Sequence, residues 1–256
     1  MSVVRLGQNF LADTNLLDAI ARASEVGPGD VVLEVGGGEG VLSGRLAELA
    51  ARVWVVELDR RLSEPLGEVA GEHPNLEVVW GDALRVDLGA LDPAPTRVVS
   101  NLPYSIATPL ILRTIAELGG VGSWTVMVQR EIAERLRAAP GSRTYGAPSV
   151  LVQLACRVEL LRTVDRAVFT PRPRVDSALL RLERLRPGAE PALAGLVRAG
   201  FAHRRKTLAA SLELAGHGPR DRARTALEAA GLDPGARAEA LSPDDFVALA
   251  ERLDGG

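Results

Sequence analysis

The chain is poor in metal-binding and membrane-spanning features, with one cysteine and three histidines among its 256 residues. The lone Cys156 excludes an intrachain disulfide, and so few thiol and imidazole groups argue against a structural zinc site. No apolar run approaches the ~20 residues of a membrane span. The N-terminal residues lack the charged-then-apolar pattern of a secretory signal. We therefore expect a cytoplasmic protein without a metal and without a membrane partner.

Lysine is almost absent, because Lys206 is the only one and arginine carries the remaining positive charge. The overall net charge of −3 hides a segregation along the chain: it is −8 over 1–129, +9 over 130–206 and −4 over 207–256. Arginine binds phosphates through a planar fork and stacks on bases, so the basic segment suits contact with RNA. A solvated arginine-rich surface is the alternative, and charge alone does not separate the two.

The first two thirds of the chain alternate strand-like and helix-like segments. This order is typical of an open parallel α/β sheet with helices on both faces. The stretch 149–161 fits a strand or a strand–helix mixture, and its pattern does not decide between them. The strand-like runs are 30–35, 51–59, 76–84, 96–102 and 123–128, and the helix-like runs include 41–50, 60–73, 109–118 and 132–139.

After a proline- and glycine-containing linker at 186–193, the segments are helix-like only. The last of them begins with Ser242 as a predicted N-cap and Pro243 at the first helical position, followed by two aspartates that suit the helix dipole. We predict a domain over 1–186 that contains the sheet and a small all-α domain over 187–256.

A glycine-rich loop follows the first predicted strand. Gly36, Gly38 and Gly40 stand between this strand and a helix, where absent side chains and free N–H groups let the backbone approach a ligand. The spacing G-x-G-x-G differs from the dinucleotide pattern G-x-G-x-x-G, so pyrophosphate is not clearly its target. A tight turn with no ligand is the alternative.

Polar side chains mark the ends of the next three strands. Glu57 ends the second strand and can accept hydrogen bonds from both hydroxyls of a ribose. Asp82 follows the third, where it can accept from an adenine amine or orient the backbone for that contact, and Asn101 ends the fourth. Each alone reads as a surface cap. Together, at the carboxyl ends of successive parallel strands, they predict an adenosine-binding site.

These segments resemble the S-adenosylmethionine-binding core of class I methyltransferases, which have a Rossmann-like sheet. More specifically, the chain resembles the KsgA/RsmA family of small-subunit (16S) rRNA adenine N6,N6-dimethyltransferases. One departure is Gly37, which stands where that family usually has proline. The resemblance covers the chain from end to end, through 7–13, 33–40, 56–59, 81–84, 101–109, 127–150, 169–182, 201–208 and 241–246.

The resemblance implies contacts with the cofactor S-adenosylmethionine, which leaves as S-adenosylhomocysteine. The segment 8–10 would fold over the methionine end of the cofactor. Gly37 would loosen the glycine loop in the free protein, so it bears on preorganisation of the site and not on the identity of the cofactor. The expected cofactor-binding residues are Gln8, Asn9, Leu11, Gly36, Gly38, Glu57, Asp82, Ala83 and Asn101.

The stretch NLPY predicts chemistry on an adenine amine. The N6 lone pair is delocalised into the ring, so holding both N6 hydrogens on the Asn101 side-chain oxygen and the Leu102 carbonyl would localise it toward a methyl donor. Pro103 fixes φ and helps to aim that carbonyl. Tyr104 offers a face for the extruded base, worth ~1–3 kcal/mol by analogy with other base–aromatic stacks. A turn with a half-buried tyrosine is the alternative reading.

A second aromatic residue and several cations complete the expected site. By resemblance Phe169 would face the target adenine opposite Tyr104, although a phenylalanine between prolines is ordinarily a packed loop anchor. Cytosine C5 chemistry would need a nucleophilic cysteine, and Cys156 lies in an apolar run. The candidate phosphate contacts are Arg130, Arg135, Arg137, Arg172, Arg174, Arg204, Arg205 and Lys206.

The resemblance therefore implies an enzyme that dimethylates N6 of two adjacent adenosines near the 3′ end of 16S rRNA, within an immature 30S subunit. We expect it to act as a monomer. A 23S rRNA adenine-N6 methyltransferase of the macrolide-resistance type shares the same core and is the main alternative. An assembly factor that has lost its enzymatic activity is a third reading, which only Gly37 supports.

Overall fold

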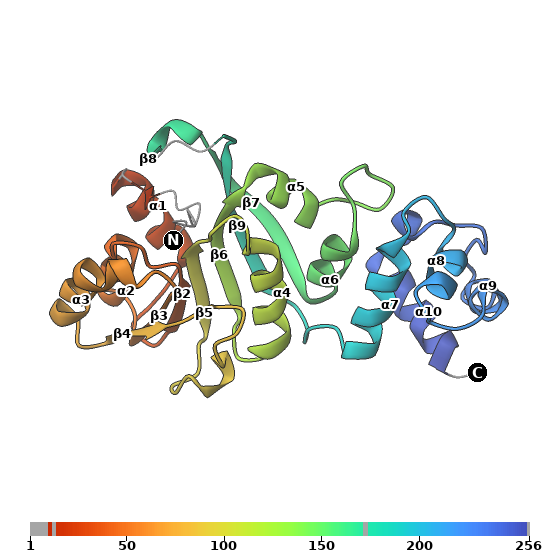
Figure 1. Ribbon diagram of the computed structural model, residues 1–256, viewed down its shortest axis with the longest axis horizontal. Coiled ribbons are helices and arrows are strands. Elements are labelled where there is room, and N and C mark those ends of the chain that lie inside the picture. The colour runs from red at the N-terminus through yellow and green to blue at the C-terminus, as the bar shows by residue number, and fades with distance from the viewer. Residues whose placement is uncertain (1–9, 12–13, 171–173, 255–256) are drawn as a thin grey trace, which may run out of the picture. The chain divides into compact units, whose positions relative to one another are not determined.

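The structure is a computed structural model that describes residues 10–11, 14–170 and 174–254 (Figure 1). The chain divides into two compact units. The first is formed by residues 1–133 and 158–184, and the second by residues 134–157 and 185–256.

The first unit contains a seven-stranded sheet in the order β4-β3-β2-β5-β6-β9-β7. Strands β2 to β6 run parallel, and β9 pairs with β6 in the antiparallel sense. The short valine-rich runs form its centre because β-branched residues suit strands that are covered on both faces. The bounds are β2 Val31–Val35, β3 Arg52–Glu57, β4 Leu76–Trp80, β5 Arg97–Asn101, β6 Ser123–Gln129, β7 Cys156–Val164 and β9 Ser177–Arg184.

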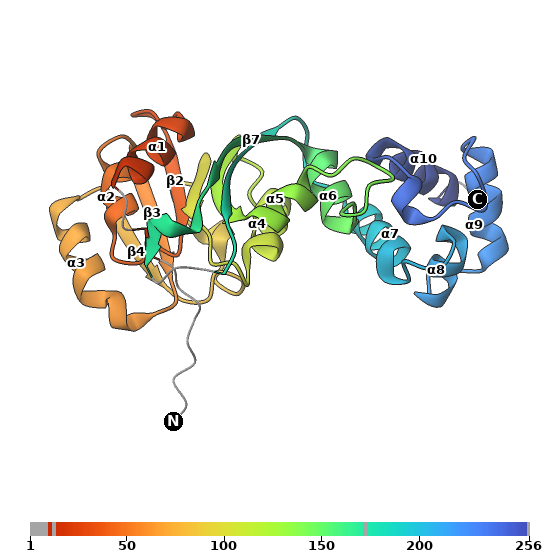
Figure 2. The same cartoon turned by 90° about the horizontal axis from the view of Figure 1, so that it is seen from above.

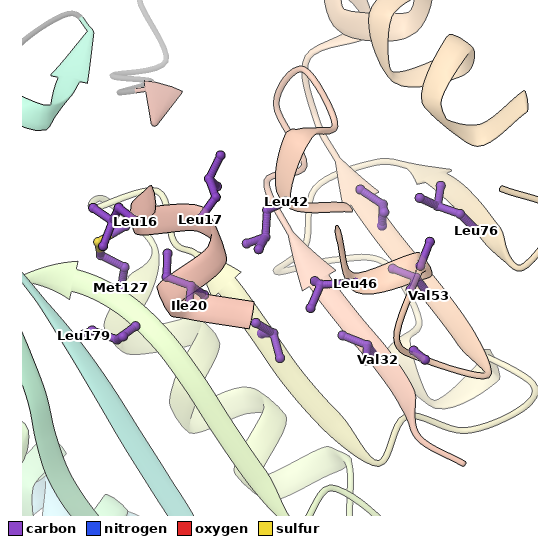
Figure 3. Packing of buried hydrophobic residues seen from close by; sticks show 14 of the residues in the cluster. Leu16, Leu17, Ile20, Val32, Leu42, Leu46, Val53, Leu76, Met127 and Leu179 are labelled. Atoms are coloured by element: carbon purple, nitrogen blue, oxygen red, sulfur yellow. The ribbon is translucent and has the colours of Figure 1, made fainter. Parts of the chain in front are cut away.

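Helices α1 (Thr14–Ser24), α2 (Val41–Ala47) and α3 (Ser63–Glu72) cover one face of the sheet. Leucines from these helices pack on side chains of β2, β3, β5, β6 and β9 that point to the same side (Figure 3). This cluster is the hydrophobic core between these helices and the sheet.

The opposite face is covered by α4 (Ala107–Glu117). Trp124 and Met127 of β6 are three residues apart and so point to opposite faces. Met127 belongs to the cluster beneath α1 to α3, whereas Trp124 Nε1 donates a hydrogen bond to Thr114 Oγ1 of α4 at 2.9 Å. The helices therefore lie on both faces, and the predicted α/β architecture is confirmed.

The remaining elements of the first unit are small. Strands β1 (Phe10–Leu11) and β8 (Phe169–Thr170) pair antiparallel, with Leu11 opposite Phe169. Helix α5 (Arg130–Leu136) follows β6 directly and passes into the second unit. The single-turn 3₁₀ segments of the described chain are Arg60–Leu62, Leu88–Ala90, Arg166–Val168 and Ala238–Ala240.

The second unit is built from helices (Figure 2). Phe246 of α10 is fully buried against Phe201, with ring centroids 5.9 Å apart. Ser242 caps α10: its Oγ accepts the Asp245 N–H at 3.1 Å, and its own N–H donates to Asp245 Oδ2, so the predicted cap is confirmed. The helices are α6 Ala147–Ala155, α7 Pro191–Ala202, α8 Leu208–Leu214, α9 Arg220–Ala229 and α10 Pro243–Asp254.

The stretch 149–161, whose pattern did not decide between strand and helix, forms most of helix α6 followed directly by the start of strand β7. The compact helical unit also includes residues 134–157, which lie upstream of the expected boundary at residue 186. Within the described ranges, none of the helices has the length and apolarity needed to cross a membrane.

Candidate functional site

A pocket of about 170 Å³ opens at the carboxyl ends of the parallel strands. It brings together the glycine loop, the two acidic positions and Pro103 of the NLPY segment, which are far apart in the sequence. Predicted residues Gly36, Glu57, Asp82, Ala83 and Pro103 all line it. The other lining residues are Val35, Val56, Leu58, Gly81, Leu84, Ser105 and Ile106.

The glycine loop adopts a conformation that requires glycine. Gly36, Gly38 and Gly40 have φ values of 80°, 58° and 84°, in the left-handed region. A Cβ at Gly36 would lie 3.2 Å from Pro103 Cδ, so the loop touches the NLPY segment through the missing side chain. At Gly37 the limit is space: a Cβ there would lie 2.4 Å from Val55 Cγ1. Gly37, which replaces the proline expected at this position, thus packs closely on Val55 of β3.

Glu57 binds the backbone of two loops at once. Its side chain is buried, its Oε1 accepts the Asp59 N–H at 2.8 Å and its Oε2 accepts the Gly38 N–H at 3.1 Å. The Gly38 N–H is therefore directed at Glu57, and Gly38 does not line the pocket. Each carboxylate oxygen has a second lone pair, so the carboxylate can still accept hydrogen bonds from a ribose.

The turn after β4 presents an acceptor beside a donor. Asp82 Oδ1 accepts the Leu84 N–H at 2.9 Å, which orients the carboxylate. Among the described residues we find no acceptor for the Ala83 N–H, and Ala83 lines the pocket. An acceptor next to a free N–H matches the N6 amine and N1 of adenine, which form its Watson–Crick edge.

The NLPY segment begins where β5 ends. Asn101 pairs with Met127 of β6, and its carbonyl oxygen is 3.9 Å from the position that a Gly36 Cβ would take. Leu102 is buried and its N–H donates to the Met127 carbonyl at 3.0 Å. Asn101 and Leu102 therefore adjoin the pocket at the glycine loop, on the side that Pro103 lines.

The Tyr104 ring is held by its hydroxyl group. Its Oη lies 2.6 Å from Oγ of Ser177, a buried residue at the start of β9. Burial raises the pKa of Tyr104 above its ordinary value of 10.0, although the hydrogen bond to Ser177 opposes this shift. The phenol therefore stays neutral at physiological pH.

Sequence reasoning missed Glu34, which lies under the glycine loop. It is completely buried in β2 and accepts a hydrogen bond from Ser43 Oγ of α2 at 2.6 Å. Burial raises the pKa of Glu34 to about 8, and the charge of Glu57 acts in the same direction. The sequence signal for Glu34 was an acidic residue inside the apolar run VVLEV.

Leu58, Ser105 and Ile106 were also missed, although they line the pocket. Leu58 is 53% exposed, which is unusual for a leucine that follows a buried strand. The sequence signal for Leu58 in the pocket wall was its position directly after Glu57, the candidate ribose-binding acid.

Some expected site residues lie elsewhere or outside the described chain. Phe169 is 2% exposed and belongs to the hydrophobic cluster beneath α1. Gln8, Asn9 and Arg172 fall outside the described residues, and for Leu11 only the pairing with Phe169 is described. The roles expected for these five residues stay predictions.

The candidate RNA-binding cations lie on both units. Arg130 and Arg174 are exposed on the first, and Arg135, Arg137 and the segment 204–206 belong to the second. Arg204 is held by its own chain, because its Nη2 lies 3.5 Å from Glu239 Oε2 and donates to the Arg143 and Tyr145 carbonyls.

Comparison with known proteins identifies close relatives. Residues 3–255 match the family described as ribosomal RNA adenine dimethylase. The chain is 46% identical to ribosomal RNA small subunit methyltransferase A of Rubrobacter xylanophilus, covering 97% of this chain and 94% of that protein. It is 44% identical to the protein of the same name from Phenylobacterium zucineum, covering 96% of this chain and 86% of that protein.

Two solved structures share the fold over nearly the whole chain. A dimethyladenosine transferase from Plasmodium falciparum is 28% identical with a TM-score of 0.78, covering 94% of this chain and 95% of that one. The 23S rRNA methyltransferase ErmE is 34% identical with a TM-score of 0.69, covering 96% and 100%. The chain, with its Rossmann-like sheet, belongs to the ribosomal RNA adenine dimethylase family.

Proposed function

We propose that this protein transfers methyl groups from S-adenosylmethionine to N6 of two adjacent adenosines near the 3′ end of 16S rRNA. The product is N6,N6-dimethyladenosine, formed during assembly of the 30S subunit. The observation that carries the proposal is the contact between the glycine loop and the NLPY segment, where Gly36 packs on Pro103. The 44–46% identity to small-subunit methyltransferases supports this choice of substrate.

The residues of the pocket fit the adenosine part of the cofactor. Glu57, already oriented by two backbone N–H groups, would accept hydrogen bonds from the ribose. Asp82 and the Ala83 N–H would bind the adenine edge, while Leu58 and Ile106 would pack on its faces. When bound, S-adenosylmethionine supplies the methyl group from its sulfonium. The leaving group is a neutral thioether, so methyl transfer to the amine needs no strong base.

The chain's own contribution to the reaction is to hold the target amine. The side-chain oxygen of Asn101 and the carbonyl of Leu102 would each accept one N6 hydrogen, which turns the nitrogen lone pair toward the pocket. Both residues are anchored on β6, since Asn101 pairs with Met127 and the Leu102 N–H donates to the same residue. Positioning of this kind can lower a displacement barrier substantially.

The target base must leave its stack to reach this site, so an exposed RNA loop is the expected substrate. Tyr104 would support the extruded base, and its bond to Ser177 fixes the ring in place. We retain Phe169 as the opposing aromatic residue. Because it is buried in the free protein, that role would require the cluster beneath α1 to open when RNA binds.

The test is transfer of labelled methyl groups to undermethylated small subunits, followed by mapping of the modified bases. We expect two neighbouring dimethylated adenosines near the 3′ end. Asn101→Ala should reduce transfer at least 100-fold (about 2.7 kcal/mol or more) while calorimetry still detects cofactor binding. Full activity in this variant would remove the acceptor role, and label in no small-subunit adenosine would remove the proposed function.

The main alternative substrate is 23S rRNA, supported by the 34% identity to ErmE. The chemistry at the amine is the same in both cases, so only the position of the modified base distinguishes the two substrates. Primer extension on both rRNAs would locate that base and decide between them. An assembly factor without enzymatic activity is a third possibility, and calorimetry that detects no cofactor binding at millimolar concentration would favour it.

The proposed substrate also implies the compartment and the partner. Assembly of a bacterial 30S subunit takes place in the cytoplasm, where we propose that this chain acts as a monomer on the immature particle. Sedimentation of the free protein, and of its complex with undermethylated subunits, would test both statements.

A further inference from the structure

Arg113 of α4 holds the turn that follows β4, 30 residues earlier in the sequence. Its Nη1 donates to the Ala83 carbonyl at 2.6 Å and its Nη2 to the Val86 carbonyl at 2.8 Å. Its Nε donates to Glu117 Oε2 at 2.8 Å, one turn further along the helix. The side chain is only 17% exposed. The planar guanidinium thus bridges two carbonyls of one turn through two separate nitrogens, while its third nitrogen binds Glu117.

The contact acts on the peptide group that orients Asp82. The carbonyl of Ala83 and the N–H of Leu84 belong to one peptide unit. Arg113 binds its oxygen, and Asp82 Oδ1 accepts its N–H at 2.9 Å. A cation on the carbonyl side polarises the peptide and strengthens the hydrogen bond on the other side. Arg113 therefore stabilises the Asp82 carboxylate in its present orientation.

The same contact joins the two halves of the site. Helix α4 begins at Ala107, directly after Ser105 and Ile106 in the pocket wall. Arg113 lies within this helix, so its bonds connect the turn after β4 to the helix that extends from the NLPY segment.

We propose that Arg113 is a positioning residue that makes the cofactor site selective for adenine. It does so by holding the 82–86 turn so that the Asp82 carboxylate and the Ala83 N–H meet the base together. The proposal rests on the cofactor part of the proposed function. Adenine presents a donor at N6 and an acceptor at N1, which match the Asp82 carboxylate and the Ala83 N–H. Hypoxanthine reverses both, because it carries a carbonyl in place of the amine and a proton on N1.

The experiment compares the dissociation constants of S-adenosylhomocysteine and S-inosylhomocysteine by calorimetry. The wild-type protein should prefer the adenosyl compound. Arg113→Met should weaken binding of the adenosyl compound about tenfold, as expected for a lost charged hydrogen bond, and should change binding of the inosyl compound by less than twofold. Arg113→Lys should resemble Arg113→Met, and it provides the test if the methionine variant does not fold.

Two control variants separate positioning from general destabilisation. Glu117→Gln removes the ion-pair partner but keeps both carbonyl bonds. Arg45→Met removes an arginine of α2 that pairs with Asp18 of α1 and with Glu48. Both should keep the adenine preference. Equal weakening of the two compounds by Arg113→Met, or none, would overturn the proposal while leaving the proposed function intact. Failure of the wild-type protein to bind S-adenosylhomocysteine would instead overturn both.

Discussion

The charged side chains around the pocket bind the protein's own backbone before they bind any ligand. Glu57 accepts N–H groups from Gly38 and Asp59, and Asp82 accepts the N–H of Leu84. Such bonds orient each carboxylate in the free protein, so less freedom is lost when a nucleoside binds. The carboxylates of the site are therefore already oriented in the free protein, by hydrogen bonds to backbone N–H groups of the neighbouring loops.

Glu34 gives a prediction at the same scale. Its folded-state pKa of about 8 lies above its ordinary value of 4.5, so its contribution to stability is present below pH 4.5 and is lost as the pH rises through about 8. Glu34→Gln keeps the shape without a titrating group. Between pH 5 and 8 the wild-type free energy of unfolding should fall relative to the variant, by up to about 1.4 kcal/mol per pH unit.

Urea denaturation at pH 5, 6.5 and 8 measures this difference. Ser43→Ala serves as a comparison, because it removes the hydrogen bond and leaves the buried carboxyl in place. Parallel pH profiles for the wild-type protein and Glu34→Gln would show that Glu34 does not titrate in this range.

At the scale of elements, each face of the sheet combines apolar packing with a buried polar contact. Helices α1 to α3 pack through apolar side chains, among them Leu16, Ile20 and Leu46 (Figure 3). On this face α2 adds the hydrogen bond between Ser43 and Glu34, and on the other face α4 adds the one between Thr114 and Trp124. Because α4 follows the NLPY segment directly, the position of this helix bears on the geometry of the reactive loop.

Thr114→Val tests that polar contact. Valine has nearly the same shape but cannot accept the Trp124 N–H, which is completely buried. An unsatisfied buried donor costs about 1–3 kcal/mol. We expect the free energy of unfolding to fall by that amount in chemical denaturation. Thr114→Ser, which keeps the hydroxyl group, should lose less than Thr114→Val, and the reverse order would contradict the role assigned to this hydrogen bond.

At the scale of the whole molecule, a protein with a net charge of −3 is proposed to bind RNA. The segregation of charge makes this possible, since residues 130–206 carry a net charge of +9. Within this segment Arg204 is engaged by its own chain, whereas Arg205 and Lys206 are exposed, and in the described part of the chain neither side chain has an ion-pair partner.

We predict that Arg205→Ala/Lys206→Ala weakens RNA binding and lowers its salt dependence. Each phosphate contact contributes about 0.7–0.9 to the slope of log K against log salt, so the double variant should reduce that slope by up to about 2. Filter binding to undermethylated subunits at several salt concentrations measures it. Arg45→Ala, in the acidic first part of the chain, is the matched control. An unchanged slope in the double variant would exclude these two cations from the interface.

Local patterns in the sequence predicted much of the fold and part of the candidate site. The alternation of valine-rich and helical segments predicted the sheet, and the glycine spacing and the acids after the strands predicted Gly36, Glu57 and Asp82 in the pocket wall, because neighbours along the chain set these features. The Ser242 cap was predictable for the same reason, since a cap involves residues only three positions apart.

Only the tertiary structure decided which distant residues meet. The bonds of Arg113 to the 82–86 turn and of Tyr104 to Ser177 join positions 27 to 73 residues apart, and no local pattern predicts such pairs. Burial likewise distinguishes Glu34 from the other acids, and the close approach of Val55 leaves no room at Gly37. The physical reason is that desolvation and steric exclusion depend on what the folded chain packs around a group, not on its neighbours in sequence.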